Sequence, residues 1–217
     1  MAPPTAVCLE IGSKLVFASA LDWPGWSRSG RDEAQALAAL AAAGGRYAVV
    51  AAEAGLAWPE EVENRLEVVE RLPGSGGTDF GVPGTPAERE LTPLSPGDLE
   101  RVTALLRAAW AVFDRVVAGA PAELRKGPRG GGRDRDKVVE HVLEGEAGYG
   151  AALGLKLSQP EAGDHAAVAA HRERLLEGLA AAARGPVKEK GWWPRYAARR
   201  ITWHVLDHAW EIEDRSV

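Results

Sequence analysis

Two histidines near the C-terminus are spaced for metal binding. His204 and His208 lie in a stretch, Gly191 to Glu213, that has no helix breaker after Pro194. A proline is tolerated near a helix start, because the N–H that it lacks would have no partner there. We therefore predict one long helix with both imidazoles on the same side, one turn apart. Imidazoles at i and i+4 can bind one metal ion, but the same spacing occurs at packed, hydrogen-bonded helix edges.

A third histidine lies in a different predicted helix. His141 is flanked by Val138 and Val142 at i−3 and i+1, beside the apolar face of that helix. One histidine on one helix and a pair on another can form a three-imidazole site inside a bundle. Three protein ligands leave coordination positions open for water or substrate, as in catalytic sites. We predict that His141, His204 and His208 bind one divalent ion.

Other polar side chains could support these ligands. A carboxylate that accepts the second imidazole N–H fixes the tautomer of a histidine ligand. Glu211 shares the face of His208, three residues earlier. The candidates for such contacts, or for extra ligands, are Asp207, His171, Glu144 and Glu211. Glu144 and Glu211 could equally be solvated, as most helix carboxylates are. His165 and His171 are six residues apart and share no helix face, so neither is predicted as part of the metal site itself.

These histidines need a helical scaffold, which the second half of the chain predicts. Apolar residues recur there at helical spacing in four long stretches separated by loops. The predicted helices run from Ser95 or Asp98 to about Val117, from Asp134 or Asp136 to about Leu155, from Pro160 to Ala183, and from Trp192 to near the C-terminus. This pattern indicates an up-down four-helix bundle.

The first part of the chain predicts a small α+β unit. The expected elements are a hairpin in residues 5–20, a helix from Glu33 to Ala43 ended by Gly44 and Gly45, an ambiguous but helix-favouring stretch at 47–57, and a third strand from Leu66 to Leu72. A connector rich in glycine and proline follows at 73–97, with Phe80 and Val82 as apolar anchors. The predicted fold class is α+β, with the N-terminal unit and connector at 1–92 and the bundle at 93–217.

Composition excludes several classes of protein. The formal charge of −5 argues against general binding to nucleic acid or membrane surfaces. Cys8 is the only cysteine, which excludes an internal disulfide and a thiolate zinc cluster. No apolar run approaches the length of a membrane span, and no secretion signal is present. We therefore expect a cytoplasmic protein with no nucleic-acid or membrane partner, and the Ala, Gly, Arg and Pro bias suggests a GC-rich bacterial genome.

Residues from about 95 to the C-terminus resemble the DinB-like superfamily of four-helix-bundle metalloproteins. The resemblance is carried by His141 on the second helix and by His204-Val205-Leu206-Asp207-His208 on the fourth. It implies a zinc or nickel ion on the three histidines, a bacillithiol- or mycothiol-dependent transferase or isomerase, and a homodimer. The N-terminal unit departs from the usual bundle. Its strand, Asp22-Trp23-Pro24-Gly25-Trp26 turn and Ala-rich helix are similar to HicB-like domains, which bind toxin partners or RNA.

Two functions compete on this reading. In the first, the protein is an enzyme whose metal ion polarises a small-molecule substrate or a low-molecular-weight thiol cofactor, because a metal-bound thiol is deprotonated. The basic loop at 125–137 could attract an anionic cofactor, although a solvated loop is the favoured interpretation. In the alternative, the bundle is a non-catalytic, stress-related scaffold that binds a ligand or partner.

Overall fold

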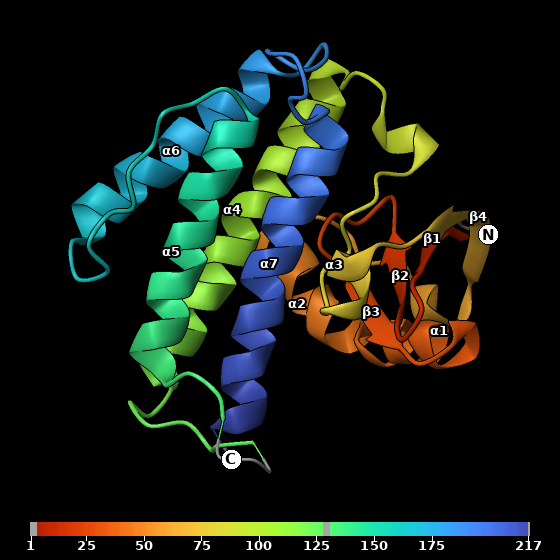
Figure 1. The fold of residues 1–217 in the computed structure, drawn as a ribbon, viewed down its shortest axis with the longest axis horizontal. Helices are drawn as coiled ribbons and strands as arrows, with labels where there is room; N and C mark the ends of the chain where they lie inside the picture. Colours follow the sequence, from red (N-terminus) through yellow and green to blue (C-terminus); the bar gives the residue numbers. More distant parts are fainter. Residues whose placement is uncertain (1–3, 128–130, 217) are drawn as a thin grey trace.

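A four-stranded mixed sheet lies beside a helix bundle in the computed structural model, which describes residues 4–127 and 131–216 (Figure 1). The strands are β1 (Thr5–Ile11), β2 (Val16–Ala20), β3 (Ser27–Gly30) and β4 (Leu66–Pro73), in the order β3-β2-β1-β4. β1 and β2 form the predicted hairpin, closed by a hydrogen bond from the Gly12 amide to the Leu15 carbonyl. β4 pairs parallel to β1. The predicted α+β fold class is confirmed.

The sequence prediction lacked two features of this unit: strand β3, and a second helix that begins directly at Gly44. The strand β3 was not predicted, because the sequence Ser-Arg-Ser-Gly has no apolar alternation, and it forms by antiparallel pairing with β2. Gly44 does not simply end a helix. Helix α1 (Glu33–Ala42) stops at Ala43, and α2 (Gly44–Glu53) starts at once with a bend of 47°. The bend lets α2 leave the sheet and pack on the bundle helix α4 (Pro96–Gly119).

The bundle consists of α4 (Pro96–Gly119), α5 (Arg135–Ala152), α6 (His165–Ala181) and α7 (Pro194–Arg215), with α6 inclined to the other three (Figure 1). Ser95 caps α4 by accepting a hydrogen bond from the Asp98 amide. α6 begins later than predicted, because Asp164 rather than the Pro160 region supplies its N-cap. Buried apolar residues of sheet and bundle form one continuous core.

In the described part of the chain no single helix could cross a membrane; only the bent pair α1 and α2 meets the length and composition requirements.

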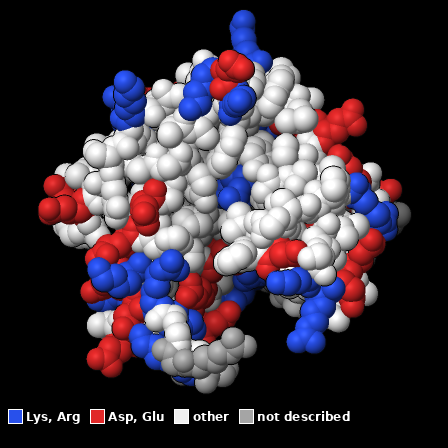
Figure 2. Space-filling model, in the orientation of Figure 1, with Lys and Arg blue, Asp and Glu red and all other residues white. Residues whose placement is uncertain are grey.

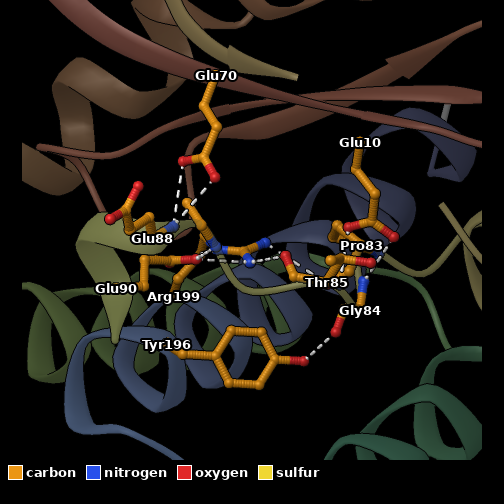
Figure 3. A network of polar contacts seen from close by, with 10 residues as sticks. Glu10, Glu70, Pro83, Gly84, Thr85, Glu88, Glu90, Tyr196 and Arg199 are labelled. Atoms are coloured by element: carbon orange, nitrogen blue, oxygen red, sulfur yellow. Dashed lines mark hydrogen bonds and ion pairs between the residues drawn. The ribbon is translucent and has the colours of Figure 1, made fainter. Parts of the chain in front are cut away.

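The connector is held by polar contacts (Figure 3). It contains α3 (Gly76–Asp79) and the short 3-10 turn Glu88–Glu90. Arg199 of α7 forms a buried ion pair with Glu90, and the Tyr196 hydroxyl donates to the Gly84 carbonyl at 2.5 Å. From the sheet side, Glu10 accepts hydrogen bonds from Thr78 and from two connector amides. The prediction that Phe80 anchors the connector is wrong, because this residue is 92% exposed. The segment is held instead through its backbone polar groups, which need hydrogen-bond partners where they are enclosed.

A carboxyl group lies inside the bundle, away from the histidines. Glu146 of α5 is fully buried and accepts a 2.7 Å hydrogen bond from the Trp110 indole. Arg172 Nε and His171 Nε2 are 3.8 Å and 3.9 Å from its oxygens, beyond hydrogen-bond reach. Burial raises the pKa of Glu146 to about 7, and Arg172 opposes this effect. The group is thus largely protonated in the folded state at mildly acidic pH.

We expect Glu146→Gln to flatten the pH dependence of stability. The pKa of the folded state exceeds that of the unfolded chain, so the folded state holds more protons between the two values and its stability falls as pH rises from about 4.5 to about 7. The loss is roughly 3 kcal/mol, from 1.36 kcal/mol per pKa unit. Urea unfolding at pH 5 and pH 8 measures it. The exposed control Glu144→Gln should keep the wild-type slope, and an equal slope in Glu146→Gln would contradict this account.

Candidate metal centre

The structure brings together the three histidines singled out from the sequence. His141 comes from α5, and His204 and His208 from adjacent turns of α7. One ring nitrogen of each lies within 4.8 Å of the others. The Nε2 atoms of His141 and His204 are 3.4 Å apart, close to the separation of roughly 3.3 Å for two imidazoles bonded to one tetrahedral zinc ion at about 2.0–2.1 Å. The donor set and its spacing fit a divalent ion.

The rings surround a common point and do not stack. The ring centroids of His141, His204 and His208 are 4.7–5.2 Å apart, with interplanar angles of 66°, 89° and 90°. His204 is buried, whereas His141 and His208 are half-buried. The centre is therefore closed on the His204 side and accessible along His141.

Burial and neighbouring charges favour the neutral form of the His204 and His141 imidazoles, which is the form that binds metal ions. Burial lowers the pKa of His204 to about 2, and the neighbouring His208 and His141 contribute further. Burial also lowers the pKa of His141, followed by the effect of His208. A neutral imidazole has the free lone pair that a ligand needs, so these two side chains require no deprotonation before metal binding at neutral pH.

Glu211 orients one of the rings. Its Oε2 lies 2.8 Å from His208 Nδ1, and its Oε1 is held by Arg215 at 2.5 Å. The hydrogen bond with His208 is the main cause that lowers the pKa of Glu211. A carboxylate at this position fixes the Nδ1–H tautomer and leaves Nε2 free to coordinate. This contact agrees with the position of Glu211 on the helix face of His208, from which the sequence predicts such a carboxylate.

Of the other candidates for second contacts, Glu144 lies beside His141 but beyond hydrogen-bond reach, and Asp207 and His171 lie elsewhere. Glu144 is exposed, and its carboxylate is 3.9 Å from His141 Nδ1. Asp207 points toward the N-terminal unit, where it forms a 2.9 Å ion pair with Arg28 of β3. His171 lies beside Glu146 inside the bundle. An aspartate next to a ligand in sequence faces another side of the helix, because adjacent residues are about 100° apart.

Gly145 is a residue of this centre that the sequence interpretation missed. A Cβ at this position would lie 2.5 Å from His204 Cε1 and 3.0 Å from its Nδ1. The missing side chain lets the His204 ring approach the backbone of α5. The available signal was a glycine inside a predicted helix, four residues after His141 and so on the same face.

Shallow clefts with mixed charge flank the histidines. One, of about 480 Å³, is lined by His141, Arg133, Lys137, Glu140 and Glu144 among others. Three of the five described basic residues at 125–137 form ion pairs with acids: Lys126 with Asp134, Arg135 with Asp136, and Lys137 with Glu140. Arg129 lies outside the described residues. Figure 2 shows basic and acidic side chains intermixed around this end of the bundle, which favours the solvated-loop interpretation.

Comparison with known proteins gives no assignment. The chain matches no protein-family model, no curated protein and no solved structure.

Proposed function

We propose that this protein is a divalent-metal-dependent enzyme of the DinB-like type, with His141, His204 and His208 as ligands. The convergence of the three ring nitrogens within 4.8 Å supports this proposal. A zinc or nickel ion held by three imidazoles supplies a Lewis acid that lowers the pKa of a bound thiol or water. The proposed activity is transfer or isomerisation of a small-molecule substrate with a low-molecular-weight thiol as cofactor.

In the proposed metal centre, the three histidines and Glu211 have different roles. His204 and His208 present two nitrogens from one rigid helix, and His141 adds the third from α5. Glu211 holds the tautomer of His208, as the 2.8 Å contact indicates. His141, the most accessible ligand, leaves the approach open for a substrate. A cytoplasmic location, expected from the sequence, suits the proposal because a thiol cofactor stays reduced there.

Metal analysis and thiol binding test this proposal. Protein purified without an affinity tag should contain about one zinc or nickel ion per chain. After exchange for Co²⁺, added bacillithiol or mycothiol should produce a thiolate-to-cobalt absorption band. The variant His165→Ala, which changes an exposed histidine of α6, should behave as wild type. An ion without a thiol band or turnover would support the scaffold alternative, and the absence of any bound ion would overturn the metal assignment.

The expected homodimer is also part of the proposal. Sedimentation velocity of the full chain should give twice the mass of one chain. A monomer at micromolar concentration would remove the dimer from this assignment and leave the metal centre intact, because all three ligands come from one chain.

We expect Gly145→Ala to weaken metal binding at least tenfold. The added Cβ would collide with the His204 ring and displace it, and metal sites respond to shifts of about 0.5 Å. Loss of ring orientation costs about 10- to 100-fold in affinity at comparable sites. Competition with a chromophoric chelator measures the change. Gly148→Ala is the matched control, since nothing lies within 4 Å of a Cβ there; both variants gain helix propensity, so equal affinities would contradict the role of Gly145.

A further inference from the structure

Arg200 is a buried arginine that has no carboxylate partner among the residues that the structure describes. Its residue exposure is 6%, and its Nε and Nη1 atoms are enclosed without a hydrogen bond. The other two buried arginines of the described chain are paired: Arg172 with Asp114 at 2.7 Å, and Arg199 with Glu90 at 2.6 Å. No ion pair within the described residues includes Arg200.

This arrangement is energetically unfavourable without a ligand. A guanidinium does not lose its charge in proteins, and removing an unpaired ion from water is energetically costly. The guanidinium lies over the rings of Trp203 and Tyr149, at 4.9 Å and 5.7 Å from their centroids. These cation–π contacts offset part of this cost, but they use the ring faces and leave the Nε and Nη1 donors unpaired. A carboxylate can accept from Nη2 together with either Nε or Nη1, the two forks of a guanidinium, and so pair one of these donors.

Arg200 is next to the histidine centre. It precedes His204 by four residues on α7, which places both on the same side of the helix. The Tyr149 ring contacts both of them, with its centroid 5.4 Å from that of His204. The Trp203 indole nitrogen is a further enclosed donor without a partner. Arg200 therefore lies about 6 Å along the helix axis from His204, whereas Trp203 directly precedes His204. No carboxylate of the described residues pairs with either donor.

We propose that Arg200, assisted by the Trp203 indole N–H, binds a carboxylate of the small molecule whose other end lies at His141, His204 and His208. The planar guanidinium matches a carboxylate, to which it can donate two hydrogen bonds. Placing the other end of the ligand at the histidines rests on the proposed metal centre; the anion site itself does not. The substrate or cofactor is thus a small acid, and a neutral analogue is discriminated against.

The test compares an acid with its amide. Co²⁺-loaded protein is titrated with 3-mercaptopropionate and with 3-mercaptopropionamide, and the thiolate-to-cobalt band reports binding. Wild type should bind the acid at least tenfold more tightly than the amide. Arg200→Met should remove this preference at unchanged cobalt content, Arg200→Lys should keep part of it, and the exposed control Arg174→Met should keep all of it. Equal affinities in wild type, or a preference retained in Arg200→Met, would overturn the proposal.

Metal-free protein separates the two proposals. Propionate should shift the NMR signal of the Trp203 indole N–H, assigned with Trp203→Phe, and Arg200→Met should abolish the shift. If no cobalt binds, the metal centre is wrong and this titration alone decides the anion site. No shift in wild type, or the same shift in Arg200→Met, would show that Arg200 binds no carboxylate.

Discussion

We expect the double variant His204→Ala, His208→Ala to lose divalent-metal binding altogether. It removes two of the three nitrogens that converge within 4.8 Å, and the remaining His141 cannot offset the dehydration of the ion. Structural zinc binding of 10–16 kcal/mol from four ligands corresponds to roughly 3 kcal/mol per ligand, or about 100-fold in affinity. Each single His→Ala variant should therefore lower the affinity by about two orders of magnitude. Metal content after dialysis and chelator competition measure both effects.

Loss of the buried imidazole of His204 could also disturb packing, so the variants need matched controls. His204→Gln, His208→Gln keeps most of the side-chain volume and should bind no more metal than the alanine pair. His165→Ala and His171→Ala lie outside the centre and should retain one ion per chain. A double variant that still holds an equimolar ion would show that the ion binds elsewhere.

Arg199→Met should destabilise the fold by about 3–5 kcal/mol, the usual result of leaving one partner of a buried ion pair alone. Arg199 donates to Glu90 through Nε and Nη2, at 2.6 Å and 2.9 Å, and both side chains are almost fully enclosed. Nη2 also reaches the Thr85 carbonyl at 3.0 Å. Although burial opposes it, Glu90 holds the pKa of Arg199 above its usual value. Urea unfolding of both proteins measures the difference.

The surface pair Arg107–Glu173 provides the control. It has the same two-point geometry, but both side chains are about half exposed, so Arg107→Met should cost less than about 1 kcal/mol. Combining Arg199→Met with Glu90→Gln should recover much of the loss, because no buried charge is then left unpaired. Equal effects at the two arginines would contradict the importance of burial. Arg199→Met should also expose residues 73–97 to limited proteolysis, since Arg199 fastens that connector (Figure 3).

Local patterns in the sequence determined much of the fold and part of the centre. The β1–β2 hairpin and the four bundle helices follow from alternation, helical spacing and caps, which depend on neighbours along the chain. The relation of His204 to His208 needs only one helix. Glu211 was included for the same reason, because residues three apart share a helix face.

Only the tertiary structure decided what depends on contacts distant in sequence. It placed His141 beside His204 and paired β3 with β2. It also turned Asp207 toward Arg28 and set the His204 ring against Gly145. The sequence alone does not distinguish Arg199 from Arg200, because they are adjacent arginines on one predicted helix. Their difference arises because a helix turns by about 100° per residue. Arg199 meets Glu90 of the connector, whereas Arg200 faces aromatic rings and, among the described residues, no carboxylate.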